Sequence, residues 1–341
     1  MDFSKIFLKD ACPTPVGGQA VMDGIMMKGL ERTAVAVRLP DGRIHMRTTP
    51  NKKPKNWQKI PIIRGVFAFL NSLIQGTEIL MYSADVLEAS YDEEEKQEPE
   101  KESKFESFIK KHFGEKGLWN FMIGFSVVIA IVFSVGVFIL LPTVVVNLLG
   151  EVTDNHVILN LTEGVFRLIL FVLYTFLIGR MEDIKVVFQY HGAEHKTIHC
   201  FENGLPLTPE NAQQFYTLHP RCGTSFLMFV MVISLVLFSL LGWPSLLMRI
   251  VSRLLLIPVV AGLSYEVLKW AGRSDNLVVK ILSLPGLYLQ KLTTRQPDNS
   301  QLEVAIAAMK AVMVPEDTPF FEGICDLDGN FVEEHIIKKE K

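Results

Sequence analysis

The clearest chemical pattern in the chain is the five-residue sequence His191-Gly192-Ala193-Glu194-His195. Positions four apart in a helix lie on the same face, about 6 Å apart along the axis. Two imidazoles at this spacing can bind one metal ion, and the glutamate beside the second can act as a general base on a water molecule. The order His-x-x-Glu-His is the inverse of the common zinc-protease motif. The pattern therefore predicts a site for Zn²⁺ or another divalent transition metal, with Glu194 as the candidate catalytic residue.

Two ligands do not make a stable zinc site, because a catalytic zinc ion usually has three protein ligands and a water molecule. Further candidates follow in the same polar segment of the chain. They are His199, His219 and Cys222.

His195 lies one helical turn from His191 and one turn from His199, so it belongs to either possible pair. His191 and His199 are about 12 Å apart along one straight helix, too far to bind the same ion easily. If His191 and His195 bind, Glu194 is placed to be the general base. If His195 and His199 bind, Glu194 is better placed to orient a ligand. Both pairs stay open, and a structural polar cluster without metal is the alternative to both.

Two long stretches, 118–150 and 223–248, contain no charged residue. Each exceeds the ~20 apolar residues that a helix needs to cross ~30 Å of hydrocarbon. Both are predicted to span a membrane.

Two weaker stretches, 165–179 and 254–265, are long enough only if flanking residues join the helix. Arg167, Arg253 or Lys269 would then extend to a membrane surface. A re-entrant or interfacial helix is the alternative for each. We expect four spans, because both large polar segments then lie on one side.

The basic residues predict which side this is. Residues 1–64 contain twelve Lys or Arg and five Asp or Glu, whereas the loop 150–163 has three acidic residues and no basic one. By the positive-inside rule the N-terminus is cytoplasmic and this loop is outside. The segment 180–222 and the tail from about 271 onward are then also cytoplasmic. The sequence predicts a multi-pass protein of the cell membrane.

The predicted fold is mainly α: a polytopic membrane protein of about four transmembrane helices, a small N-terminal β-unit and a cytoplasmic C-terminal helix. A hairpin at 33–49 turns at Pro40-Asp41-Gly42, because apolar and polar residues alternate on both sides of this turn. The expected regions are a basic β-unit (1–59), an amphipathic or interfacial helix (60–91), an acidic linker (92–117), a membrane core (118–271) with the His/Cys hairpin (180–222), and a tail (272–341) with a helix at 301–313. A fifth span is the alternative for 60–91.

Local signals divide the His/Cys hairpin and the tail. Glu202-Asn203-Gly204 predicts a helix end, and Thr208-Pro209 predicts a new helix that reaches about Thr217. Ser300, with Glu303 three residues later, predicts the cap of the tail helix. The residues 326–330 predict a turn rather than a calcium loop.

The remaining composition limits the partners. The four cysteines are at positions 12, 200, 222 and 325, and they form no Cys-x-x-Cys pair, which excludes a zinc ribbon. On the predicted topology they are cytoplasmic and reduced, so a thiolate is available as a ligand. Arg221 is expected to pair with Glu202 or with a lipid phosphate. Membrane lipids and a membrane-protein partner are expected, and nucleic acid is not.

Long motifs carry a family resemblance. They are GGQAVMDGIMMKG (17–29), YHGAEHKTIHCFE (190–202), HPRCGTSFL (219–227), GRSDN (272–276) and LQKLTTRQPDNSQLEVAIAAMKAV (289–312). Through them the chain resembles the YqhQ-like family of bacterial membrane proteins over nearly all its length. The resemblance implies a metal-dependent membrane protein and names no reaction.

Two functions fit these patterns. The first is a membrane-embedded metal-dependent hydrolase with its site at the cytoplasmic surface, where His191, His195 and either His219 or Cys222 hold the ion. The second is a non-enzymatic scaffold or accessory factor of a translocation or envelope-assembly complex, in which the His/Cys cluster is structural.

Overall fold

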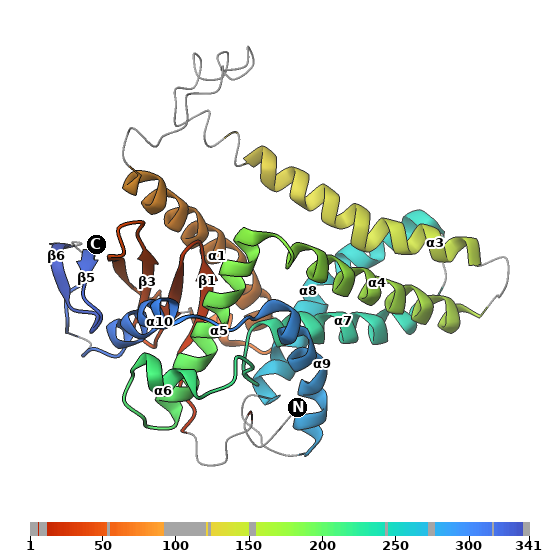
Figure 1. Cartoon of the computed structure of the whole chain (residues 1–341). Coiled ribbons are helices and arrows are strands. Elements are labelled where there is room, and N and C mark those ends of the chain that lie inside the picture. Colours follow the sequence, from red (N-terminus) through yellow and green to blue (C-terminus); the bar gives the residue numbers. More distant parts are fainter. Residues whose placement is uncertain are drawn as a thin grey trace, which may run out of the picture. The chain divides into compact units, whose positions relative to one another are not determined.

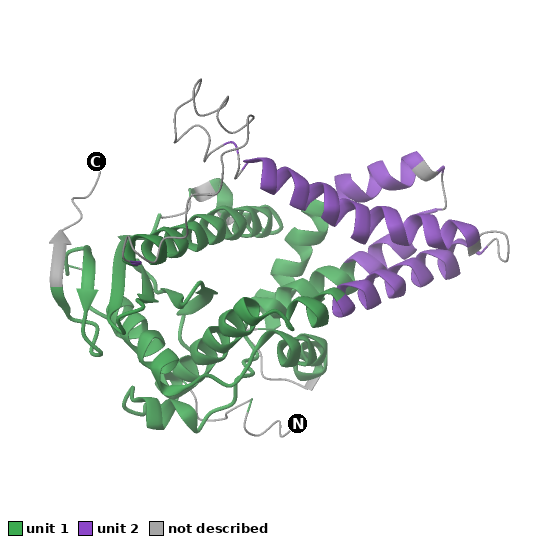
Figure 2. Ribbon diagram, turned by 45° about the horizontal axis from the view of Figure 1, so that its top comes forward, with its two compact units in different colours: residues 1–90, 174–233, 257–341 green, residues 91–173, 234–256 purple. Residues whose placement is uncertain are grey.

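The computed structural model divides the chain into two compact units. Unit 1 comprises residues 1–90, 174–233 and 257–341, and unit 2 comprises residues 91–173 and 234–256 (Figure 2). The residues described are 6, 12–52, 55–91, 121, 124–149, 155–242, 245–271, 277–315 and 317–336. The predicted acidic linker (92–117) and the motif at 272–276 lie outside them.

Unit 1 is built on a six-stranded antiparallel sheet in the order β1-β2-β3-β4-β5-β6 (Figure 1). The predicted N-terminal β-unit and its hairpin are confirmed, since β3 and β4 pair with Arg38 opposite Ile44. The last two strands come from the C-terminal tail, which the sequence did not predict. The strands are β1 (Gly17–Val21), β2 (Gly24–Lys28), β3 (Arg32–Arg38), β4 (Ile44–Pro50), β5 (Phe321–Cys325) and β6 (Phe331–Ile336).

The middle of this sheet is buried on both faces, because successive side chains of a strand point to opposite sides. On one face Ile25 and Ala34 pack in a core shared with α5 (Glu182–Glu202) and α10 (Asn299–Val312). On the other face Met26, Val35 and Val37 pack against Ile79 and Leu87. Both of these residues belong to α1 (Ile63–Ser90), so helices cover the sheet from two sides.

The turn signals mostly locate the helix ends. Helix α5 ends at Glu202 with Asn203 as its C-cap, and Gly204 follows with a φ of 68°. Helix α6 (Pro209–Gln213) begins after the cap Thr208, whose side chain accepts from the backbone N–H of Asn211, as predicted. Helix α6 ends at Gln213, whereas it was predicted to reach about Thr217. The turn at 326–330 is also present, with Asp326 N–H donating to the carbonyl of Asn330 at 2.9 Å.

The predicted cap of the tail helix is wrong by two residues. Asp298 caps α10 and accepts from the backbone N–H of Gln301, whose side chain completes a capping box. Asp298 takes this place because its carboxylate also accepts from Ser300 at 2.7 Å. Glu303 on α10 instead pairs with Arg38 on β3 at 2.7 Å.

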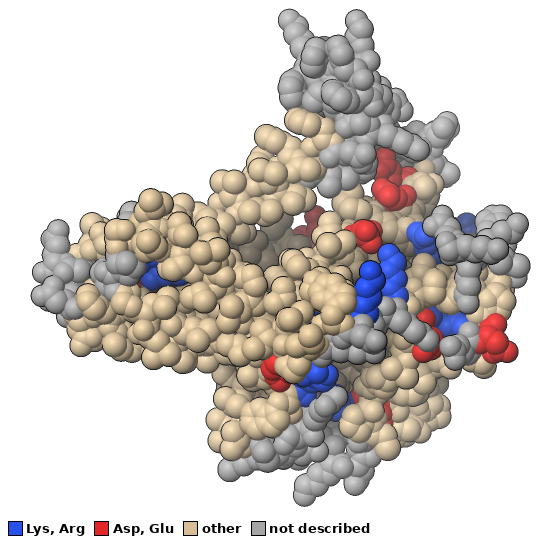
Figure 3. Space-filling model, turned by 180° about the vertical axis from the view of Figure 1, so that it is seen from behind, with Lys and Arg blue, Asp and Glu red and all other residues tan. Residues whose placement is uncertain are grey.

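Among the described residues, three helices are long and apolar enough to cross a membrane: Gly124–Leu148, His156–Ile178 and Leu247–Ala271. These are the helices of a membrane protein. The second and third, α4 (His156–Ile178) and α8 (Leu246–Ala271), confirm that the two weaker stretches recruit flanking residues. The visible surface of the unit 2 helices carries few charged side chains (Figure 3).

The expected span 223–248 is wrong as one helix. Its first part forms α7 (Thr224–Ser239), an apolar helix of 16 residues, and its last residues belong to α8. Helix α7 ends in a turn and a bend at residues 240 and 241, just before Gly242, and glycine is a poor helix former.

The expected extension of Arg167 and Arg253 to a membrane surface is also contradicted. Their side chains are buried, with exposed fractions of 8% and 4%, and both pair with Glu163. Arg167 donates to Glu163 at 2.8 Å within α4, because an ion pair inside the bundle replaces the water that the guanidinium would otherwise need.

Helix α1 contacts α8 within unit 1 at two glycines. A Cβ on Gly65 would lie 2.8 Å from the Cα of Gly262, and one on Gly262 would lie 2.7 Å from the carbonyl oxygen of Ile62. Arg64 binds Glu266 beside this crossing through two hydrogen bonds. Small residues permit such close approach between helices. The helix predicted at 60–91 is present as α1. It is not among the three candidate spans found in the described residues.

We predict that Gly262→Ala lowers the melting temperature of the detergent-purified protein, because overpacking costs ~1–3 kcal/mol while the helix propensity of alanine returns only ~1 kcal/mol. The matched control is Gly124→Ala, since a Cβ at Gly124 meets nothing within 4 Å. Differential scanning fluorimetry measures both. Equal melting temperatures for the two variants would contradict the close crossing.

Candidate metal centre

Helix α5 carries most of the candidate residues and lies in the core of unit 1. It packs against β1 and α10, and eleven of its residues are buried. The loop that joins α6 to α7 then returns across it, with Thr217, Leu218 and His219 contacting α5 side chains. This return brings Cys222 to the histidines, as the predicted hairpin requires.

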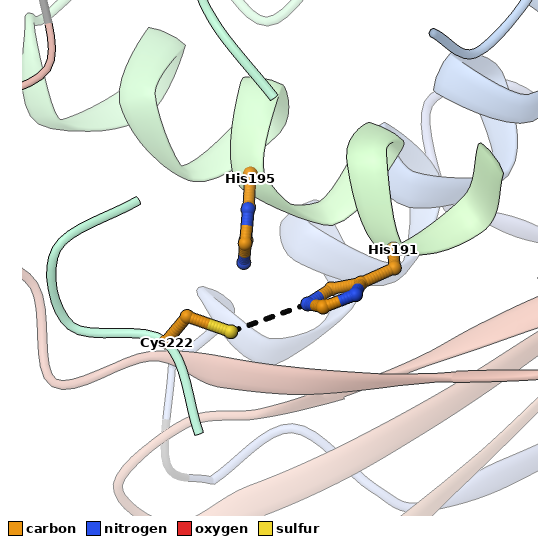
Figure 4. A group of neighbouring side chains, drawn as sticks. All are labelled: His191, His195 and Cys222. Atoms are coloured by element: carbon orange, nitrogen blue, oxygen red, sulfur yellow. Dashed lines mark hydrogen bonds between the residues drawn. The ribbon is translucent and has the colours of Figure 1, made fainter. Parts of the chain in front are cut away.

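His191, His195 and Cys222 form one group of possible ligands. Their ligand atoms all lie within 4.8 Å of one another, and the Nε2 of His191 is 3.2 Å from the Sγ of Cys222. The three side chains point toward one another from α5 and from the loop (Figure 4). The structure thus brings together the first pair of histidines considered above and one of the two residues proposed to complete the site.

Backbone carbonyls fix both imidazoles of this group. The Nδ1 of His191 lies 2.8 Å from the carbonyl oxygen of Thr293, and the Nδ1 of His195 is bonded to the carbonyl oxygen of Thr217. A carbonyl only accepts, so each Nδ1 carries a proton, and Nε2 is the nitrogen of each ring that can bind a metal ion once the ring is neutral. The Nε2 of His195 is buried and has no hydrogen-bond partner in the described part of the chain. Such bonds orient histidines that bind metals through Nε2.

Gly192 allows the segment that contains Thr293 to approach the helix. A Cβ on Gly192 would lie 2.0 Å from the carbonyl oxygen of Arg295, which no side chain tolerates. The backbone N–H of Arg295 donates to the carbonyl of Phe188 at 2.8 Å and holds the segment there. The glycine inside the His-x-x-Glu-His motif is therefore a packing requirement of the site.

Glu194 lies beside the first group and is 6% exposed. Its carboxylate accepts a hydrogen bond from the backbone N–H of Gly18 on β1. A Cβ on Gly18 would lie 2.9 Å from the carboxyl carbon, so only glycine permits this approach. Burial raises the pKa of Glu194, although the imidazoles of His195 and His191 and the N–H of Gly18 act in the opposite direction.

The first group is electrostatically suited to a thiolate. Burial alone would raise the pKa of Cys222, but the nearby imidazoles of His195 and His191 hold it well below its ordinary value. Burial alone would lower the pKa of His191, but the Cys222 thiolate raises it to about 9. Both pKa shifts favour a protonated His191 beside a Cys222 thiolate. A metal ion that binds here would displace the proton of His191.

His199, Glu202 and His219 form a second group of possible ligands, next to the first. The rings of His199 and His219 are 4.5 Å apart, and those of His195 and His219 are 5.7 Å apart. Burial is the main reason that the pKa of His199 falls to about 3 and that of His219 falls well below its ordinary value. Both rings are neutral at pH 7.

The second group is already occupied by internal bonds. Glu202 forms a salt bridge with Arg221 and accepts from the backbone N–H of Thr14 at 2.8 Å. His219 Nε2 lies 3.5 Å from Glu202, and its Nδ1 accepts from the backbone N–H of Arg221 at 3.3 Å. The predicted pairing of Arg221 with Glu202 is confirmed. The first group, in which the Nε2 of His195 has no hydrogen-bond partner among the described residues, is the better candidate for a metal site.

The five predicted ligands thus fall into two adjacent groups rather than one. Glu202 was named as part of a helix end and as a partner of Arg221, and sequence reasoning missed it as a possible ligand. It also missed Gly18 and the two carbonyls. Residue types do not show which backbone carbonyl will bind a side chain. The glycines at 18 and 192, however, do indicate positions where another segment can approach closely.

Comparison with known proteins agrees with the motifs. Residues 60–314 match the model of a family described as "Protein of unknown function (DUF1385)". A protein of Bacillus subtilis (strain 168), "Uncharacterized protein YqhQ", is 36% identical over 311 residues, which cover 89% of this chain and 94% of the relative. The chain belongs to this YqhQ-like family. No solved structure matches it. The family description names no reaction, so the chemistry has to be argued from the site.

We predict that Arg221→Gln destabilises the protein by about 2–3 kcal/mol, because it leaves the buried carboxylate of Glu202 without its cation. The loss should stay below the full cost of breaking a buried pair, since the Arg221 side chain is 27% exposed. Chemical unfolding of the purified protein measures it. The double variant Glu202→Gln/Arg221→Gln should recover part of the loss.

The matched control for this prediction is Lys185→Gln, which removes the cation of the exposed pair with Glu182. Exposed pairs contribute little to stability, so this variant should unfold like the wild type. A similar loss of stability in both variants would mean that the buried Glu202–Arg221 pair stabilises the protein no more than the exposed Glu182–Lys185 pair does.

Proposed function

We propose that this protein is a membrane-embedded metal-dependent hydrolase. His191, His195 and Cys222 would hold a divalent transition metal, with Zn²⁺ as the expected ion. The observation that carries the proposal is the convergence of two imidazoles and one cysteine, whose ligand atoms lie within 4.8 Å of one another, with each Nδ1 fixed by a backbone carbonyl. Three protein ligands of this kind are typical of zinc sites that keep one position for water or substrate.

The chemistry of the donor set fits the ion. Imidazole and thiolate are the ligands that zinc prefers, and the low pKa of Cys222 provides the deprotonated sulfur that binding requires. The buried Nε2 of His195, which has no partner among the described residues, would gain one. A carboxylate-only site for magnesium or calcium would need oxygen ligands, which this group lacks.

Glu194 would be the general base of the reaction. It lies directly before His195 in the chain, is held by Gly18 N–H, and is close enough to His191 and His195 to interact with both charges. A zinc ion, when bound, would supply Lewis acidity and acidify a coordinated water. Glu194 would accept the proton and pass it to the leaving group, as carboxylates do in hydrolases.

A structural cluster is the second candidate, and the burial of the group favours it. His195 and Cys222 are both buried, and His191 is the one ligand of this group that is partly exposed. In that case the group would tie the α6–α7 loop to α5, and the protein would serve as a scaffold or accessory factor of a translocation or envelope-assembly complex. The variants described next separate the two candidates.

We predict that His195→Ala and Cys222→Ala lose the zinc found by elemental analysis of the purified protein, while Glu194→Gln keeps most of it. The control His156→Ala, which removes an exposed histidine at the start of α4, should keep all of it. Both His195→Ala and Glu194→Gln should fail to complement a strain that lacks the gene, because one loses the ion and the other the base.

The outcomes divide the candidates. Full complementation by Glu194→Gln, together with loss of zinc and of function in His195→Ala, would leave a structural metal site. Absence of zinc from the wild-type protein, purified without chelators, would overturn the metal centre itself.

We also propose four membrane crossings with both ends of the chain in the cytoplasm. Strand β4 pairs with β5, so both ends belong to one sheet and lie on one side. The number of crossings between them is then even, whereas three helices in the described ranges meet the length requirement. Helix α7, ~24 Å long, supplies the fourth with modest thinning of the bilayer. The excess of Lys and Arg in residues 1–64 makes this side cytoplasmic, and lipids are the expected surroundings.

We predict that Cys12, which is exposed, reacts with a membrane-impermeant maleimide only after the cells are lysed. In a Cys12→Ser background, His156→Cys should react in intact spheroplasts, because one crossing separates it from the cytoplasm. The other three cysteines are buried and give a low background. Labelling of both positions from the same side would contradict the four-crossing topology.

A further inference from the structure

Helix α9 (Leu277–Thr293) ends beside the metal centre, and the sequence motif at 289–312 begins on its last turns. The last carbonyls of a helix have no partner within that helix. The carbonyl of Thr293 is one of these, and it binds the Nδ1 of His191. Gln290, one turn earlier on α9, is buried and contacts the loop that precedes α7. The end of α9 therefore contacts both segments that supply ligands, α5 directly and the loop through Gln290.

Gln290 uses both ends of its side-chain amide on the backbone of one residue, His219. Its Oε1 accepts from the backbone N–H of His219 at 2.8 Å, and its Nε2 donates to the carbonyl of His219 at 2.9 Å. The same Nε2 lies 3.3 Å from the hydroxyl oxygen of Ser225. Gln290 is 0% exposed, so water would not replace these bonds if the amide were lost.

The carbonyl that Gln290 binds is also the acceptor for Cys222. The backbone N–H of Cys222 donates to the carbonyl of His219 at 3.3 Å and closes a turn. Thr217, whose carbonyl fixes the Nδ1 of His195, lies two residues before this turn. Gln290 thus holds the backbone between the third ligand and the group that orients the second.

Two further contacts keep α9 against the same loop. Leu287 of α9 and Leu218 of the loop belong to one buried apolar cluster. A Cβ on Gly286 would lie 2.9 Å from the Cβ of Ser225, so α9 approaches the start of α7 more closely than a side chain at position 286 would allow. Helix α9 is therefore a packed support, and Gln290 is its polar contact with the backbone of the loop.

We infer that Gln290 is a positioning residue of the metal centre, an assignment that rests on the proposed function. By binding the backbone of His219 it sets where Cys222 and the carbonyl of Thr217 lie relative to α5. Loss of the amide would free the turn that carries Cys222 to shift away from the two imidazoles. Residues that orient metal ligands in this way typically contribute about 10–100-fold to metal affinity.

A buried glutamine that only stabilised the fold would behave differently. Its replacement would lower the melting temperature, because a buried backbone N–H and carbonyl would lose their partner. The folded fraction of such a variant would still bind zinc as tightly as the wild type. The affinity for metal therefore separates a positioning role from a purely structural one, whereas the melting temperature does not.

The test compares zinc affinities of full-length variants in mild detergent, measured by competition with a chelator of known affinity. Gln290→Met nearly keeps the size of the side chain, removes both bonds to His219, and should weaken zinc binding about 10–100-fold. The matched control is Asn51→Leu, which removes another side-chain amide of unit 1, one that donates to the carbonyl of Gly29 at 2.8 Å. This control should bind zinc like the wild type.

Substitution of Co²⁺ for zinc gives a second readout that does not depend on activity. The charge-transfer absorption of the bond between Co²⁺ and the Cys222 thiolate should weaken in Gln290→Met and persist in Asn51→Leu. Gln290→Asn is the deciding variant if Gln290→Met does not fold. Its amide is one methylene shorter and reaches one backbone group of His219 rather than both, so a smaller loss of affinity is expected.

The outcomes separate this role from the metal centre itself. Equal zinc affinity of the wild type and the folded Gln290 variants would overturn the positioning role and leave the metal centre standing. Absence of zinc and cobalt binding by the wild type would overturn the metal centre and the role of Gln290 with it.

Discussion

Two hydrogen bonds from imidazole Nδ1 atoms to backbone carbonyls determine what the centre of unit 1 can do. The carbonyl of Thr217 comes from the loop that precedes α7, and that of Thr293 from the end of α9 (Leu277–Thr293). Each bond fixes the tautomer of one histidine and turns its second nitrogen toward Cys222. Without them the motif on α5 would be two imidazoles free to rotate. The chemistry thus depends on segments far from the motif in the sequence.

Two glycines, Gly192 and Gly18, are required for the same reason. Gly192 admits the 293–295 segment, and Gly18 admits the carboxylate of Glu194 to the edge of β1. Because each glycine lacks a side chain, a neighbouring segment can approach it closely. A rigid backbone group then holds His191 in the first case and Glu194 in the second. The motif supplies the reactive atoms, while neighbouring elements supply their orientation.

Sequence patterns predicted what is local. Alternation predicted the hairpin of β3 and β4, and the Thr208-Pro209 signal predicted the start of α6. Helical spacing placed His195 in a pair with either His191 or His199 and could not choose between the two. Patterns could not predict β5 and β6, because pairing with β4 joins residues as distant as Ile44 and Cys325. They placed Arg167 and Arg253 at a membrane surface for a similar reason. Glu163 pairs with Arg253 of another helix, which spacing along the chain does not show, whereas its position one turn before Arg167 on α4 was a local signal that the prediction did not use.

The sheet order has a consequence for biosynthesis. Strand β4 leaves the ribosome early, but its neighbour β5 is made only after all the apolar helices between them. Until then β4 presents an open edge that can pair with other chains, a known hazard of unfinished sheets. Helix α10, which covers the sheet beside α5, is also among the last segments to be translated. The Cys222 thiol and the imidazoles of α5 therefore acquire their final enclosure only when synthesis ends, and a chain stalled before its C-terminus would leave them exposed.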